Sequence, residues 1–100
     1  MKIKTIDINA KEWFDKTYGN SYFSANITIN FGMKTEKSFS MPFQYGYGDH
    51  YIDMAFQELK KKGFIKNANE RMALWAYCKD NGIILRYSKQ ENCKKRDLNN

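Results

Sequence analysis

Hydrophobic and polar residues alternate strictly along residues 21–31, the most regular stretch of the chain. Alternation with a period of two is typical of a strand that has one buried and one solvated face. The alternation resumes over residues 34–43, and Gly32 lies between the two stretches, where a tight reversal is needed. The pattern therefore predicts an antiparallel hairpin. The residues expected on its buried face are Phe23, Ala25, Ile27, Ile29, Phe31, Phe39, Met41 and Phe43.

Two further strands are predicted near the ends of the chain. Residues 2–9 hold three isoleucines in a short β-branched run, and residues 83–87 are apolar enough for a central strand of the sheet. We expect Pro42 at the end of its strand or on an edge, because proline cannot donate a hydrogen bond to a strand ladder.

Capping patterns predict three helices. Asn9 and Glu12 have the spacing of a capping box, which predicts a short helix over residues 10–17 with Trp13 and Phe14 against the core.

The other two helices follow the hairpin. Apolar residues at helical spacing predict a helix over residues 50–62, with Asp49 as its N-cap and Gly63 as the left-handed residue after its end. A second capping box at residues 67–70 predicts a helix that runs to about residue 80.

The predicted order is β-α-β-β-α-α-β, which indicates an α+β domain with helices on one face of a mainly antiparallel sheet. Without the extra helix, this is the βαββαβ order of the ferredoxin-like fold. We expect one domain over residues 1–88 and a basic, flexible C-terminal tail over residues 89–100.

Composition narrows the class of partner. The chain has 100 residues, 16% of them aromatic, and a net charge of +6, which favours anionic partners such as nucleic acid or an acidic protein surface. Residues 83–100 carry five basic and two acidic side chains, so half of the excess charge lies there.

The two cysteines do not form a redox or zinc motif, and their number fits a reducing cytoplasm. Cys78 falls in a helical apolar pattern, so we expect a buried thiol, whereas Cys93 is expected to be a free thiol in the tail. We predict a cytoplasmic protein without a membrane partner, because the N-terminus lacks the apolar region of a signal peptide and no apolar run is long enough to span a bilayer.

The joint between the hairpin and the helix after it, residues 42–51, concentrates glycine and tyrosine and holds the only histidine. Gly46 and Gly48 lack the third glycine of a dinucleotide-binding fingerprint, and His50 has no neighbouring metal ligands at a zinc-site spacing. We therefore predict a protein that is not an enzyme and that uses no cofactor and no metal.

Basic and aromatic residues give the leading functional hypothesis. Rings that stack on bases, with lysine and arginine along the phosphates, are how single strands are held. The motif of RNA-recognition domains is missing from residues 34–40, and the same surface would also suit a protein partner. The residues predicted to bind nucleic acid or a protein partner are Tyr45, Tyr47, His50, Lys60, Lys61, Lys62, Arg86, Lys94, Lys95 and Arg96.

Residues 13–15, 19–24 and 42–51, which read WFD, GNSYFS and PFQYGYGDHY, resemble small proteins encoded by tailed phages and prophages. The resemblance implies a phage or mobile-element accessory protein that acts by binding in the host cytoplasm, on nucleic acid or a nucleoprotein complex. It also implies the alternative of a protein-directed inhibitor of host defence, of the anti-CRISPR type. The family has no assigned activity, so the resemblance identifies no functional residue.

Overall fold

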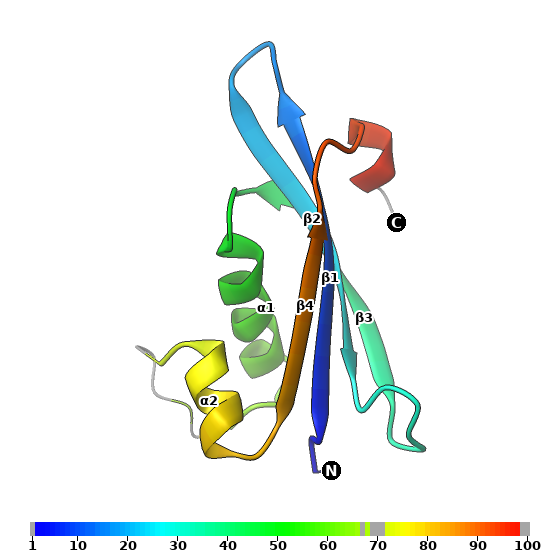
Figure 1. Cartoon of the computed structure of the whole chain (residues 1–100), viewed down its shortest axis with the longest axis vertical. Coiled ribbons are helices and arrows are strands. Elements are labelled where there is room, and N and C mark those ends of the chain that lie inside the picture. The colour runs from blue at the N-terminus through cyan, green and yellow to red at the C-terminus, as the bar shows by residue number, and fades with distance from the viewer. Residues whose placement is uncertain (1, 67, 69–71, 99–100) are drawn as a thin grey trace.

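The computed structural model describes residues 2–66, 68 and 72–98. Three strands come first, two helices follow, and a fourth strand and a 3-10 helix end the described chain (Figure 1). These elements are β1 (Thr5–Asp15), β2 (Asn20–Ile29), β3 (Lys37–Tyr45), α1 (His50–Lys61), α2 (Leu74–Asp80), β4 (Ile84–Gln90) and η1 (Lys95–Leu98).

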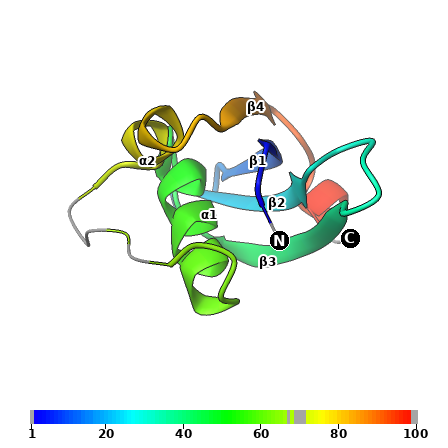
Figure 2. The ribbon, with the colours of Figure 1, turned by 90° about the horizontal axis from the view of Figure 1, so that it is seen from below.

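The strands form one mixed sheet in the order β3-β2-β1-β4. The β1–β2 and β2–β3 pairs are antiparallel, but β4 runs parallel to β1. A parallel pair needs a long crossover, and α1 and α2 supply it on one face of the sheet (Figure 2). The α+β class is therefore confirmed, whereas the sheet is not purely antiparallel.

The helix predicted over residues 10–17 is wrong, because β1 continues through this segment to Asp15. Its residues pair with β2 down to Asp15 opposite Asn20, and Gly19 closes the hairpin with a φ of 71°. Local capping in this segment is outweighed by a full ladder of pairs with β2. With that helix absent, the order of the ferredoxin-like fold does not occur.

The helix predicted over residues 50–62 is confirmed as α1. Asp49 precedes it without a side-chain capping hydrogen bond. Gly63 adopts a φ of 81°, and the amide of Phe64 donates to the carbonyl of Leu59 at 3.0 Å, as a Schellman ending requires. The capping box predicted at residues 67–70 lies, apart from Ala68, outside the described residues.

The last strand differs from its prediction in place and in length. β4 is an edge strand rather than a central one, and Ile84 is 60% exposed. It runs to Gln90, so the domain boundary expected after Ser88 falls inside a strand.

The segment expected to be a flexible tail packs on the domain in the structure. The amide of Cys93 donates to the carbonyl of Glu12 at 3.0 Å, and Leu98 is buried. η1 lies on the opposite side of the sheet from α1 and α2 (Figure 1).

The main core fills the space between the sheet and the two helices. Phe31, predicted to be buried, is instead 65% exposed, because β2 ends at Ile29 and Asn30 turns the chain with a φ of 54°. The core side chains are Ile6, Ile8, Ala10, Phe23, Ala25, Ile27, Ile29 and Met41 from the sheet, with Tyr51, Ala55, Phe56, Leu59, Leu74 and Cys78 from the helices.

An irregularity in β3 changes which face its last residues use. Met41 pairs with Ala25 and Gln44 pairs with Phe23, so β3 carries one more residue than β2 over this interval. Such a bulge shifts the alternation. Phe43, predicted to face the core, consequently lies on the opposite face, where its ring stacks on Tyr22.

Candidate functional site on the open face of the sheet

The face of the sheet turned away from α1 and α2 carries a patterned set of side chains, which we call the open face. Its residues lie opposite one another in rows that cross the strands. From the N-terminal end of β1 onward, the rows are Ser38, Thr28, Asp7 and Arg86; then Ser40, Asn26, Asn9 and Ser88; then Ser24, Lys11 and Gln90; and finally Tyr45, Tyr22 and Trp13, with Phe43 beside them.

The side chains of the first row are hydrogen-bonded to one another. Arg86 donates from Nε and Nη2 to the two carboxylate oxygens of Asp7, at 2.7 and 3.0 Å. The hydroxyls of Thr28 and Ser38 lie 3.0 Å apart and share a hydrogen bond. Since the Asp7 carboxylate is engaged by a guanidinium, this row adds little net charge to the open face.

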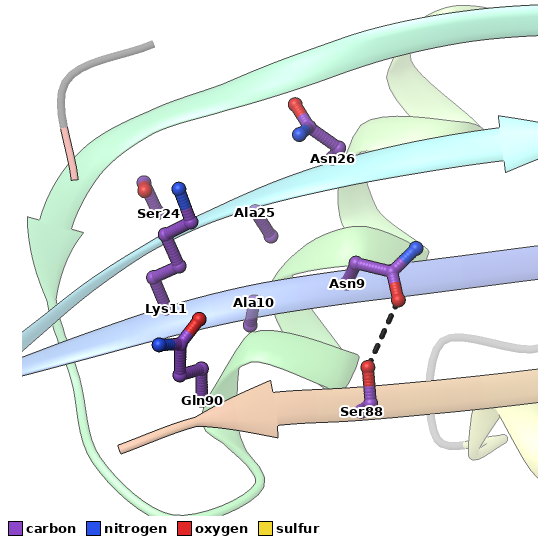
Figure 3. Close-up of a pocket in the computed structure, with 8 residues that line it drawn as sticks. All are labelled: Asn9, Ala10, Lys11, Ser24, Ala25, Asn26, Ser88 and Gln90. Carbon is purple, nitrogen blue, oxygen red and sulfur yellow. Dashed lines mark hydrogen bonds between the residues drawn. The ribbon is translucent and has the colours of Figure 1, made fainter. Parts of the chain in front are cut away.

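The second and third rows surround a hollow of about 210 Å³ (Figure 3). Ser40 and Ser88, on the outer strands, donate to the side-chain oxygens of Asn26 and Asn9, at 2.6 and 2.9 Å. Lys11 lies one row further on, opposite Ser24 and Gln90. The hollow is therefore lined by amides, hydroxyls, one ammonium group and two alanines, and none of the described residues that line it carries a carboxylate.

The fourth row is a cluster of aromatic rings. The ring centre of Tyr22 lies 5.5 Å from that of Trp13, 4.9 Å from that of Phe43 and 5.8 Å from that of Tyr45. The first two pairs are stacked and the third is edge-on.

These rings are partly open to solvent and lie beside a cation. Tyr45 is 59% exposed, while Trp13, Tyr22 and Phe43 are half-buried. Lys95 from η1 holds its ammonium 5.6 Å from the Trp13 ring centre. The cluster therefore combines half-open ring faces with a positive charge.

The structure brings three of the predicted site residues to the open face and leaves the others elsewhere. Tyr45 and Lys95 border the aromatic row, and Arg86 lies in the first row, about 20 Å away along β1. Lys94 and Arg96 are exposed beside Lys95 in the segment that contains η1.

The remaining predicted residues flank α1, at its two ends. Tyr47 and His50 line a hollow of about 420 Å³ at its start, together with Asp49 and Asp53. These carboxylates make that hollow unfavourable for an anion.

Lys60, Lys61 and Lys62 lie at the other end of α1, roughly 16 Å along the helix axis from its start. The ammonium of Lys60 lies 3.9 Å from the ring centre of Phe56, and that of Lys62 lies 5.0 Å from the ring centre of Phe39. These lysines therefore form a separate basic group rather than one surface with the tyrosines of residues 45–47.

The sequence prediction missed Trp13, Phe43 and the asparagine row. The signal for the first part of β1 was present in the sequence, because Asp7, Asn9 and Lys11 alternate with Ile6, Ile8 and Ala10, but the alternation does not continue to Trp13. The strand was not predicted beyond Asn9 because Asn9 and Glu12 were interpreted as a capping box. Nothing local signalled that Phe43 would change face, since this depends on the bulge opposite Ser24.

A group of charged residues around Lys89 lies near the start of α1 and connects parts of the fold. The half-buried Lys89 donates from its ammonium to the carbonyl of Gly48 at 3.0 Å and to Glu12 at 3.4 Å. It also lies 6.0 Å from the ring centre of Tyr51, whose pKa is raised by burial and then by the nearby negative charge of Asp49. These contacts tie the loop before α1 to the end of β4.

Neither cysteine is positioned as an exposed nucleophile. Cys78 is 2% exposed, and burial raises the pKa of its thiol to about 11, which disfavours the reactive thiolate. Cys93 is buried as well, and its Sγ donates to the carbonyl of Gln90 at 3.4 Å. Across residues 2–66, 68 and 72–98, no three histidine, cysteine or acidic side chains come together as a metal site.

Comparisons with protein-family models, with curated proteins and with solved structures gave no match to this chain. The resemblance to small phage proteins accordingly stays a prediction. Within the part of the chain that the structure describes, no helix has the length and apolar character needed to cross a membrane.

Proposed function

We propose that this protein is a non-enzymatic binding protein that holds single-stranded nucleic acid, free or within a nucleoprotein complex, on the open face of its sheet. The observation that supports this proposal is the half-exposed cluster of Trp13, Tyr22 and Phe43 with Lys95 above it. Unpaired bases stack on such rings whatever their sequence, and each stacked base contributes about 1–3 kcal/mol.

Charge along the open face supports a polyanionic ligand. Lys11 and Lys95 are cationic, and the one carboxylate within the four rows, that of Asp7, is bonded to Arg86. The rows extend about 20 Å from Asp7 to Trp13, the rise of six strand residues. A short single strand can therefore contact rings and cations together.

The test is a titration of labelled single-stranded oligonucleotides and duplexes at two salt concentrations. We expect single strands to bind more tightly than duplexes, with affinity that falls as salt rises. Absent affinity, or affinity that salt does not change, contradicts the proposal.

The two tryptophans of the chain supply a matched pair of variants. Trp13→Leu removes a ring from the open face, whereas Trp75→Leu removes one that is 65% exposed on α2. We expect Trp13→Leu to lower affinity roughly 5-fold to 100-fold and Trp75→Leu to leave it unchanged. Lys95→Gln removes the cation beside the Trp13 ring at an exposed position and should also lower affinity. Equal losses of affinity in Trp13→Leu and Trp75→Leu would argue against binding on the open face.

A second candidate function is the protein-directed inhibition of a host defence system, of the anti-CRISPR type. The observation that favours it is the outer edge of β4, which is unpaired within the described chain and carries neither proline nor a bulge. β3, the other edge, has both. An open edge of this kind can accept a strand from a partner protein.

Capture from a nuclease-treated host lysate separates the two functions. A protein partner that stays bound after nuclease digestion supports inhibition by a protein contact. A partner that digestion releases supports binding through nucleic acid.

A further inference from the structure

We infer that the hollow between the second and third rows of the open face is a binding site for a phosphate group, built around the side-chain amides of Asn9 and Asn26. The inference rests on the proposed function in taking the backbone phosphate of a single strand as the ligand. The chemistry of the site follows from separate observations on the side chains of Asn9, Asn26, Ser40 and Ser88.

The outer serines fix the direction of both amides. Ser40 Oγ donates to Asn26 Oδ1 at 2.6 Å, and Ser88 Oγ donates to Asn9 Oδ1 at 2.9 Å. Because each amide oxygen already accepts a hydroxyl proton, the acceptor side of each amide is directed toward an outer strand. Figure 3 shows the bond from Ser88 to Asn9 at the edge of the hollow.

The donor side of each amide is consequently left for a ligand. Asn9 and Asn26 are direct partners in the β1–β2 register, so their Cβ atoms lie about 5 Å apart. Among the described residues, neither amide nitrogen donates to a protein acceptor. Each NH₂ group has two donors, so the centre of the sheet presents four.

The surroundings of these donors are positive or neutral. Lys11 and Gln90 adjoin Asn9 in the next row, and the Ser24 hydroxyl lines the hollow although the residue is 1% exposed. The nearest carboxylate on the open face of β1, that of Asp7, already accepts two bonds from Arg86. Within the part of the chain that the structure describes, no carboxylate lines the hollow to compete for the ammonium or for the amide donors.

A cluster of donors with one cation selects a ligand that only accepts hydrogen bonds and carries negative charge. A volume of about 210 Å³ is smaller than ordinary ligand pockets and suits a single phosphate group. The aromatic row lies only two strand residues beyond Lys11, about 7 Å away. A phosphate in the hollow therefore leaves its own or the neighbouring base within reach of the rings.

The first arm of the test titrates inorganic phosphate into the protein and follows the side-chain amide signals of asparagine by ¹H–¹⁵N correlation NMR. We expect the signals of Asn9 and Asn26 to shift together, and the exposed amide of Gln57 on α1 to stay unchanged. Shifts spread evenly over the surface amides would overturn the inference.

The second arm measures oligonucleotide affinity for Asn9→Asp and Asn26→Asp, which exchange donors for acceptors without changing shape. Gln57→Glu adds the same charge on the helical layer and is the matched control. We expect each asparagine variant to lower affinity roughly 10-fold or more beyond this control. The double variant Ser40→Ala with Ser88→Ala adds no charge, frees both amides to rotate, and should lower affinity about 3-fold to 10-fold.

The outcomes separate the inference from the proposed function. If oligonucleotides bind but the asparagine variants match Gln57→Glu, the phosphate site is wrong and the proposed function stands. If phosphate shifts both amides but no oligonucleotide binds, the site stands for a free phosphate and the proposed function fails. If neither ligand binds, both are wrong.

Discussion

The rings of Tyr22 and Phe43 stack across the β2–β3 pair, with their centres 4.9 Å apart and 14° between their planes. This contact holds the bulged end of β3 against the sheet on the open face, and it joins β3 to Trp13 on β1 through Tyr22. The aromatic row is therefore both the surface proposed to bind bases and a second, smaller apolar cluster that stabilises the β1–β2 hairpin.

We predict that Tyr22→Ala lowers the free energy of unfolding by about 2 kcal/mol, because it removes two stacked contacts and one edge-on contact. Tyr18→Ala is the matched control, since Tyr18 is 78% exposed in the hairpin turn, and it should change stability by less than about 0.5 kcal/mol. Urea unfolding followed by circular dichroism measures both. Equal effects would show that the row does not stabilise the fold.

We predict that the C-terminal segment stabilises the domain. Leu98→Ala should lower the free energy of unfolding by roughly 2–3 kcal/mol, because Leu98 is 1% exposed. Lys94→Ala, at an exposed position of the same segment, should change it by less than about 0.5 kcal/mol. Thermal unfolding of the two variants decides the question, and an unchanged midpoint for Leu98→Ala would mean that the segment is dispensable.

We predict that Asn30 is the most sensitive polar position in the chain. Its Oδ1 accepts from the amides of Lys4 and Thr5, and its Nδ2 donates to the carbonyl of Lys2 and the hydroxyl of Thr35. Asn30→Ala removes four partly buried hydrogen bonds at once and should cost about 3 kcal/mol of stability, measured by urea unfolding.

The control for Asn30 is Asn92→Ala. Both residues have a positive φ, 54° at Asn30 and 58° at Asn92, but Asn92 is exposed. This variant should cost only about 1 kcal/mol, the penalty for placing alanine in the left-handed region. A similar loss for both variants would assign the effect to backbone conformation rather than to buried hydrogen bonds.

We predict that the Cys78 thiol makes stability fall at high pH. Burial raises its pKa to about 11 in the folded protein, so the unfolded chain loses this proton at lower pH than the folded chain does. The folded state then binds more protons between roughly pH 9 and 11, and the free energy of unfolding decreases across that window. Cys78→Ala should show a shallower decrease in urea unfolding at stepped pH.

The burial of Cys78 also predicts how its thiol reacts with thiol reagents. A thiol reagent at pH 8 should modify this cysteine only after unfolding, because the residue is 2% exposed. Rapid modification of native protein at Cys78 would contradict the burial that raises the pKa.

Much of the fold could be predicted from residues close together in the chain. The alternation from Phe23 to Ile29 identified β2 and its buried face, and the apolar spacing with Gly63 identified α1 and its end. These predictions hold because a side chain's direction in a strand or helix repeats with a fixed period.

The candidate site was less accessible to sequence reasoning. Of the residues predicted to bind, Tyr45, Arg86 and Lys95 lie on the open face, while Lys60, Lys61 and Lys62 lie in the helical layer. Charge and ring content are properties of composition, but their grouping on one face depends on the order of strands.

By itself, the sequence determined that a buried sheet face and an amphipathic helix exist, because these depend on periods of two and of about 3.6 residues that neighbouring positions express directly. Only the tertiary structure decided that residues 10–15 extend β1, that Phe43 changes face and that Leu98 is buried. Each of these depends on a partner outside its own segment: β2 for residues 10–15, Tyr22 for Phe43, and the open face for η1. Pairing with another strand outweighs a local helix signal, since the ladder and the core contacts stabilise many residues at once.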